Sequence, residues 1–160
     1  MHSPFVFRFV TQCLYKKIEK KEGLKSDKLY QEFLIKGINY FQPSNVFLPK
    51  EENTLSPSIL KINSTVHVIK ELKFEDHLDF VVFRSLNSVN ETLHFFEKIW
   101  LKVHNDTVFF IKHPYQNKST QLSWEAIKND KKVTVTVDCF YFGFFFVRKE
   151  QSKEHFTIRV

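Results

Sequence analysis

The sequence predicts an α/β fold in which helices cover both faces of a mostly parallel sheet. Strand-like and helix-like segments alternate along most of the chain, which is typical of a doubly wound sheet. The chain then closes on two strand-like runs, "VTVTVD" (133–138) and "FFFVRK" (144–149). Because few residues separate these runs, we expect them to pair as an antiparallel hairpin, with Gly143 supplying the tight turn.

Hydrophobic spacing assigns the other elements. Runs that read as strands lie at 45–48, 65–72, 78–83 and 106–113. Apolar residues at helical spacing predict helices over 27–41, 88–100 and 119–130, and one helical turn over 58–62. The strand "LDFVVF" (78–83) is apolar almost throughout, which predicts a central position in a parallel sheet.

Residue types at two helix starts predict how those helices are capped. The first segment, "MHSPFVFRFVTQCLYKK", reads as an amphipathic helix with Ser3 as its N-cap and Pro4 at its first position. Ser88 and Glu91 have the spacing of a capping box. We therefore interpret Ser88 as a cap and not as a nucleophile.

Length and composition narrow the class of protein. The 160 residues predict one domain over 1–160, with N-terminal helices in 1–43 and the sheet core in 44–160. No signal-peptide pattern and no apolar run of roughly 20 residues occur, which predicts a cytoplasmic protein with no membrane contact. Acidic residues interrupt the lysine-rich segment 16–28, so the net charge of +6 favours a solvated surface over a nucleic-acid surface.

The cysteines, histidines and phenylalanines indicate no metal site and a core rich in aromatic rings. The two cysteines, Cys13 and Cys139, have no CxxC spacing, and the seven histidines have neither HxH nor HExxH spacing, so no metal site is predicted. Phenylalanine is used 19 times. The Phe-rich run "CFYFGFFF" is interpreted as buried strand and not as a surface for stacking bases.

The two ends of the chain resemble a known family. "HSPFVF" and "VTVTVDCFYFGFFFVRKEQSKEHFTIRV" are similar to the class I S-adenosylmethionine-dependent methyltransferases, in the O-methyltransferase-like branch of Bacteroidetes-type bacteria. The resemblance implies a Rossmann-like doubly wound sheet of seven strands with an antiparallel last strand. The family has a further helix and strand where this chain passes directly from 65–72 to 78–83, so the sheet is expected to be one edge strand short.

Positions that bind the cofactor in the family differ in this chain. The resemblance implies an acid and a glycine-rich turn after the first strand, but Leu48 stands at the acid and Lys50 and Thr54 at the glycines. Glycine there lets the backbone approach the cofactor without a Cβ in the way. The acid that ends the second strand falls at Lys70 or Glu71, so Glu71 is a candidate remnant of the cofactor site.

At the ends of the next two strands, this chain again lacks the acids that the family has. Where the resemblance implies acids near the methyl donor or a metal, this chain has Arg84 and Ser85 after one strand and Lys112 and His113 after the other. A lysine ammonium cannot ligate Mg²⁺, which takes oxygen ligands. The sequence therefore predicts a degenerate, shortened methyltransferase-like protein with no catalytic residues, no metal and no expected cofactor.

Three functional hypotheses follow. The first is a non-catalytic binding or structural domain, acting as a homodimer or paired with an active relative. The second is an active methyltransferase with an atypical pocket, in which Glu71 still holds S-adenosylmethionine. The third is an anion-binding or nucleic-acid-binding module, with nucleic acid not favoured, whose candidate site comprises Arg84, Lys112, His113 and Tyr115.

Overall fold

A seven-stranded mixed sheet organises the described part of the chain. The computed structural model describes residues 3–16, 26–83 and 86–160. The strand order is β2-β1-β3-β4-β6-β5-β7. In chain order the strands are β1 (Asn45–Phe47), β2 (His67–Ile69), β3 (Leu78–Val82), β4 (Val103–Lys112), β5 (Val135–Asp138), β6 (Phe142–Phe146) and β7 (Glu154–Thr157).

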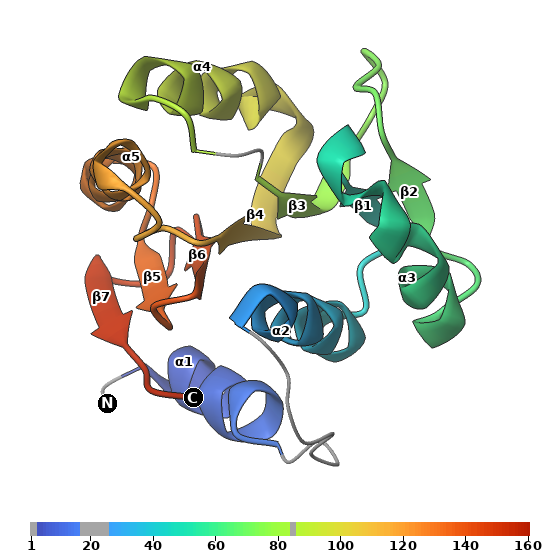
Figure 1. The fold of residues 1–160 in the computed structure, drawn as a ribbon, viewed down its shortest axis with the longest axis horizontal. Coiled ribbons are helices and arrows are strands. Elements are labelled where there is room, and N and C mark those ends of the chain that lie inside the picture. The colour runs from blue at the N-terminus through green and yellow to red at the C-terminus, as the bar shows by residue number, and fades with distance from the viewer. Residues whose placement is uncertain (1–2, 17–25, 84–85) are drawn as a thin grey trace.

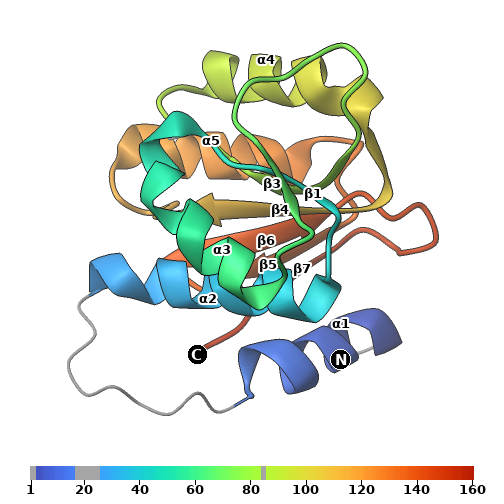
Figure 2. The same ribbon diagram turned by 90° about the vertical axis from the view of Figure 1, so that its right-hand side faces the viewer.

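Helices flank the sheet on both sides (Figure 1). On one side lie α1 (Pro4–Phe9), α2 (Ser26–Phe41) and α3 (Ser56–Ile62), and on the other lie α4 (Val89–Ile99) and α5 (Lys118–Asn129). Figure 2 shows α1 and α2 on the same side of the sheet, and Phe5 and Phe9 of α1 contact the phenylalanine rings of β6 directly. Short segments extend three of the elements: a π-helix at Val10–Leu14 and 3₁₀-helices at Lys50–Leu55 and Trp100–Lys102. The described residues contain no helix long and apolar enough to cross a membrane.

The predicted α/β architecture is confirmed. Strands β1 to β4 pair in parallel, and β6 pairs antiparallel with both β4 and β5. In the described residues, β2 leads to β3 without an intervening helix or strand, so this edge of the sheet ends at β2, as the resemblance implied. The seventh strand comes from the opposite edge, where β7 pairs in parallel with β5.

Both predicted helix caps are confirmed. The Ser3 side chain accepts a hydrogen bond from the Val6 amide at 3.2 Å, and Pro4 is the first residue of α1. The Ser88 side chain accepts a hydrogen bond from the Glu91 amide at 3.1 Å. Ser88 is therefore the N-cap of α4, as its spacing from Glu91 predicted.

The prediction that Gly143 makes the hairpin turn is wrong. Gly143 lies inside β6, where it pairs with Asp138 and Ile111. The turn uses residues 139–141 instead, and Phe140 takes the positive φ of 70°. Glycine at 143 avoids a tight contact, because a Cβ there would lie 3.1 Å from the Trp124 ring.

Phenylalanine side chains on alternate faces of β6 fill both layers of the core. Phe142, Phe144 and Phe146 face α1 and α2, whereas Phe145 faces α4 and α5. Phe145 stacks on Phe109 with 4.5 Å between ring centroids. These rings are fully buried, so the Phe-rich run is core, as predicted, apart from Phe140 and Tyr141 in the turn.

We predict that Gly37→Ala destabilises the protein. A Cβ at Gly37 would lie 2.9 Å from the Phe144 ring. That ring is packed between Phe9 and Phe110, and each of their ring centroids lies 5.0 Å from its own. We expect the free energy of unfolding to fall by about 1–3 kcal/mol through overpacking, although alanine favours helix by ~1 kcal/mol. Urea denaturation measures the change.

Asn39→Ala is the matched control, because Asn39 is exposed in the same helix. It should leave stability unchanged or slightly raised, since it adds helix propensity without a clash. Equal stability of the two variants would contradict the tight packing of Gly37 on Phe144.

Candidate functional site

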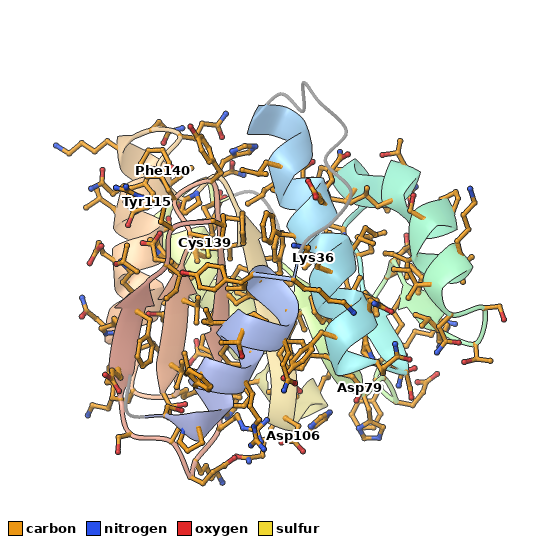
Figure 3. The ribbon with its side chains drawn as sticks, turned by 90° about the horizontal axis from the view of Figure 1, so that it is seen from below. Lys36, Asp79, Asp106, Tyr115, Cys139 and Phe140 are labelled. Carbon is orange, nitrogen blue, oxygen red and sulfur yellow. The ribbon has the colours of Figure 1, made fainter. Side chains whose placement is uncertain are left out.

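The carboxyl ends of β1, β3, β4 and β5 meet at one edge of the sheet. In this architecture ligands bind in the crevice outside that edge. Figure 3 shows Tyr115 and Phe140 at one edge of the sheet and Asp79 and Asp106 at the opposite edge. The candidate residues that follow β1 and β4 therefore belong to the edge where a ligand is expected.

The segment after β1 forms a short helix in place of an open turn. Pro49 is extended, with φ −64° and ψ 156°, and the 3₁₀-helix Lys50–Leu55 follows directly. The Glu52 amide donates to the Pro49 carbonyl at 2.9 Å, so this N–H is used within the turn. Proline 49 has no N–H to offer. The segment therefore differs from an open glycine turn at Pro49, which has no N–H, and at Glu52, whose N–H is already bonded.

Glu52 carries the buried charge of this segment. Its side chain is only 3% exposed and forms an ion pair with Lys112 at the end of β4. The Tyr30 hydroxyl donates to the same carboxylate at 3.1 Å, and the Lys112 ammonium lies 5.5 Å from the centre of the Tyr30 ring. His113 contacts Tyr30 edge-on, with 5.1 Å between ring centroids. This cluster joins α2, the segment after β1 and the end of β4.

A second buried carboxylate lies at the end of β5. Asp138 accepts hydrogen bonds from the Tyr115 hydroxyl, from Trp124 Nε1 at 2.9 Å and from the Phe140 amide at 2.9 Å. Lys128 adds an ion pair at 3.3 Å. Burial by itself raises the pKa of Asp138, but the donors and the Lys128 charge outweigh it and hold the pKa below the usual range. Burial, followed by the Asp138 contact, raises the pKa of Tyr115.

Three of the four candidate anion-site residues have other contacts in the structure. Lys112 pairs with Glu52, His113 packs on Tyr30, and Tyr115 donates to Asp138. Arg84 lies outside the described residues, as does most of the lysine-rich segment, residues 17–25. A cavity of about 400 Å³ between the end of β4 and the start of α5 is lined by Lys112 and Lys118. The convergence of these residues on an anion stays a prediction.

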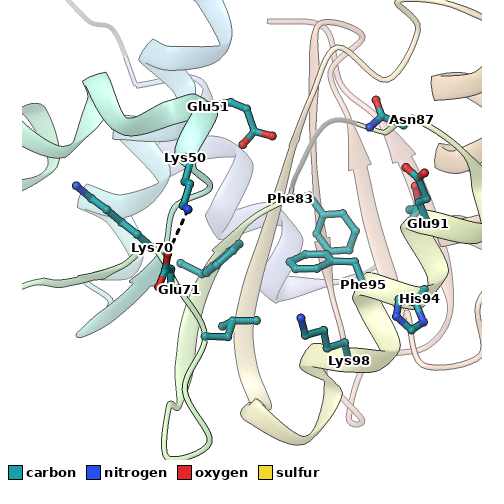
Figure 4. Close-up of a pocket in the computed structure, with 13 residues that line it drawn as sticks. Lys50, Glu51, Lys70, Glu71, Phe83, Asn87, Glu91, His94, Phe95 and Lys98 are labelled. Atoms are coloured by element: carbon teal, nitrogen blue, oxygen red, sulfur yellow. Dashed lines mark ion pairs between the residues drawn. The ribbon is translucent and has the colours of Figure 1, made fainter.

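A larger cleft of about 560 Å³ lies between α4 and the residues that follow β2 (Figure 4). Glu71 lines it and forms an ion pair with Lys50 at 3.1 Å, in which the side chains are 76% and 70% exposed respectively. The candidate remnant of the cofactor site is therefore in a cleft, but its carboxylate already has a partner.

Sequence reasoning missed Glu52, Tyr30 and Asp138. The sequence does contain a signal for Asp138, because this acid is the last residue of an apolar strand and so lies at the edge where ligands bind. Glu52 had none, since it lies in a polar segment and its partner Lys112 is 60 residues away. Within the described residues, no three His, Cys, Asp or Glu side chains are grouped as a metal ion would require.

Comparison with known proteins identifies solved structures of similar fold, but no matching family model and no matching curated protein. No family model matches the chain, and no curated protein matches it. A putative O-methyltransferase from Klebsiella pneumoniae has 7% sequence identity, and the match covers 90% of this chain and 96% of that one with a TM-score of 0.51. An O-methyltransferase from Bacillus cereus, in complex with SAH, has 11% identity over 88% and 95% of the two chains with a TM-score of 0.46.

The first of these likenesses, at 7% identity, shows the fold alone. The chain therefore has a methyltransferase-like, Rossmann-like fold, with parallel strands β1 to β4 and antiparallel pairing around β6. This agrees with the fold that the family resemblance implied from the two ends of the sequence.

We predict that Asp138→Asn flattens the loss of stability in acid. The folded-state pKa of Asp138 lies below its ordinary value. Its stabilising contribution is therefore complete above the unfolded pKa of about 4 and disappears as the pH falls through the folded pKa. Urea denaturation between neutral pH and about pH 3 should show a smaller decline in the variant than in the wild type. Glu97→Gln, which changes an exposed carboxylate of α4, should keep the wild-type slope.

We also predict strong energetic coupling between Glu52 and Lys112. Lys112→Met leaves a buried carboxylate without its cation, which should lower the free energy of unfolding by about 3–5 kcal/mol. In a Glu52→Gln background the same substitution should cost much less, because no buried charge is stranded. A double-mutant cycle measured by urea denaturation tests this, and additive effects of the two substitutions would contradict a buried ion pair.

Proposed function

We propose that this protein is a methyltransferase-like domain that has lost S-adenosylmethionine binding and catalysis and acts by binding another molecule. The observation that carries the proposal is the buried ion pair between Glu52 and Lys112. In the family that the sequence resembles, the segment after the first strand is a glycine-rich turn for the cofactor. Here the same segment sends a buried carboxylate into the crevice, where Lys112 and Tyr30 bind it.

The energetics support a loss of cofactor binding. A ligand that enters this part of the crevice has to displace the Glu52 side chain from Lys112, and breaking a buried ion pair costs about 3–5 kcal/mol. Once Glu52 is displaced, the Lys112 ammonium has lost its counter-charge, and the sulfonium of S-adenosylmethionine, which is itself a cation, would meet it. A like-charge contact at about 4 Å costs ~1 kcal/mol in water and several times more in a partly buried site.

An active enzyme with an atypical pocket is the second candidate, and the place of Glu71 favours it. Glu71 follows β2 and lines the 560 Å³ cleft, where the resemblance expects the acid that binds the ribose. Its ion pair with Lys50 is exposed. Since exposed pairs contribute only about 0–1 kcal/mol, Glu71 could exchange Lys50 for a ligand at little cost.

An anion-binding module is the third candidate. Lys112 and Lys118 line the smaller cavity at the start of α5, and a helix N-terminus also favours negative charge. The pairing of Lys112 with Glu52 weakens this candidate, because that charge is already neutralised. Under any of the three hypotheses, a homodimer is a further proposal, which sedimentation of the purified protein would test. A complex with an active relative is another, which sedimentation of the mixed proteins would test.

Calorimetric titration with S-adenosylmethionine and with S-adenosylhomocysteine tests the leading proposal. We expect no heat of binding for either compound up to about millimolar concentration, equivalent to less than ~4 kcal/mol of binding free energy. Binding in the micromolar range would overturn the proposal.

A pair of variants then separates the first two candidates. If Glu71 binds a ribose, Glu71→Gln should weaken any cofactor binding by roughly tenfold or more. Glu91→Gln is the control, because Glu91 lines the same cleft from α4. An equal response of both variants would exclude a specific role for Glu71.

A further inference from the structure

In the described part of the chain, backbone groups on the outer edge of β7 have no hydrogen-bond partner. β7 is the last strand of the sheet, and Figure 1 shows it in red at the left end. The Glu154 and Ile158 amides each donate at 2.8 Å to carbonyls in or next to β5. Because successive residues of a strand point their N–H and C=O groups to opposite sides, His155, Thr157 and Arg159 direct theirs away from β5.

The opposite edge of the sheet offers fewer free groups. β2 spans only His67–Ile69. The His67 amide donates to the Ser44 carbonyl at 2.8 Å, and the Ile69 carbonyl accepts from the Leu48 amide at 2.9 Å. Only Val68 within β2 therefore points its N–H and C=O outward. Since a ladder between two strands repeats at every second residue, β7 is the better edge for adding another strand.

β7 lacks the features that normally keep an edge strand unpaired. Natural sheets protect their edges with lysine, proline, β-bulges or a covering segment. β7 contains neither lysine nor proline, and its register with β5 runs without a bulge. Lys153, which precedes it, folds back, because its ammonium donates at 2.8 Å to the carbonyls of both Asp130 and Val133. The edge is therefore open to a further strand.

A second copy of β7 fits this edge in an antiparallel register. Outward-pointing residues have to face each other, which is met when Thr157 lies opposite Thr157 of the second copy on a two-fold axis. Phe156 then lies opposite Ile158, and both side chains belong to the core layer of α1 and α2. Threonine pairs and pairs of an aromatic with a β-branched residue are favourable across strands. The sequence of β7 is thus complementary to itself.

Charges favour this register over its neighbour. With Phe156 on the axis instead, Lys153 would lie opposite Arg159, and like charges directly opposite are destabilising. With Thr157 on the axis, Arg159 lies opposite His155. Burial, followed by the nearby charges of Lys153 and Lys128, lowers the pKa of His155. The imidazole is therefore neutral near pH 7 and does not repel the guanidinium.

We propose that two copies of this chain associate by antiparallel pairing of β7 with β7, which joins their sheets into one. Thr157 lies on the two-fold axis, and His155 and Arg159 exchange backbone hydrogen bonds on either side of it. The proposal rests on the homodimer considered above and names its interface, but it does not depend on loss of the cofactor. Strand pairing buries less surface than a standard interface, so we expect a dissociation constant of roughly 1–100 μM.

Sedimentation of the full chain from about 1 μM to about 1 mM tests the association. We expect a reversible equilibrium between monomer and dimer. In hydrogen exchange followed by NMR, the His155 and Thr157 amides should be protected only at the high concentrations. The Val68 amide, which points outward at the other edge, should exchange rapidly throughout. A chain that stays monomeric, or a dimer without protection at Thr157, would overturn the proposal.

Opposite charges on the axis test the register. Thr157 is exposed, so Thr157→Lys and Thr157→Glu should both fold, which urea denaturation checks. Each variant alone brings like charges face to face and should weaken the dimer by roughly tenfold or more. An equimolar mixture should associate again, because opposite charges then face each other.

Ser58→Lys and Ser58→Glu are the matched controls, because Ser58 is exposed in α3 beside the other end of the sheet. Alone or mixed, they should sediment as the wild type does. A mixture of the two Thr157 variants that associates no better than either alone contradicts pairing at this strand. Titration with S-adenosylmethionine is a separate readout, so loss of the cofactor and this dimer can fail independently.

Discussion

The buried carboxylate of Glu52 is the constraint on which the carboxyl edge of the sheet depends. A charge that is only 3% exposed has to be paired and hydrogen-bonded, and its partners come from two distant parts of the chain, Lys112 at the end of β4 and Tyr30 in α2. The pair therefore fixes the segment after β1 against both elements. The same contact lies at the carboxyl edge of the sheet, where ligands bind in folds of this architecture.

The sheet itself depends on a close packing of phenylalanine rings against two glycines. Phe144 leaves no room for a Cβ at Gly37, and Trp124 leaves little at Gly143. A chain with 19 phenylalanines and three glycines can build such a core only if the glycines lie where rings approach the backbone. The glycines of α2 and β6 therefore lie where the core rings approach the backbone most closely.

The secondary structure could be predicted from the sequence because its causes are local. Ser3, Pro4 and Ser88 act on helices within a few residues of themselves, and the alternation in "VTVTVD" is a property of one strand. The ion pair between Glu52 and Lys112 could not be predicted, since it joins residues 60 positions apart. β7 was missed although burial alternates along its four residues, and Gly143 was misassigned because the sequence does not show the Trp124 ring that packs on it.

The carboxyl edge of the sheet and the cleft beside α4 differ in how far the chain's own side chains fill them. The chain passes from β2 to β3 through residues 70–77 without a helix, so the region beside α4 keeps a cleft lined by Phe47, Phe83 and Phe95. At the edge of the sheet, the segment after β1 has instead turned its own side chains inward. The cleft beside α4 is lined by three lysines and three glutamates, namely Lys50, Lys70, Lys98, Glu51, Glu71 and Glu91. Because these charges balance in number, the lining does not by itself select the sign of a ligand.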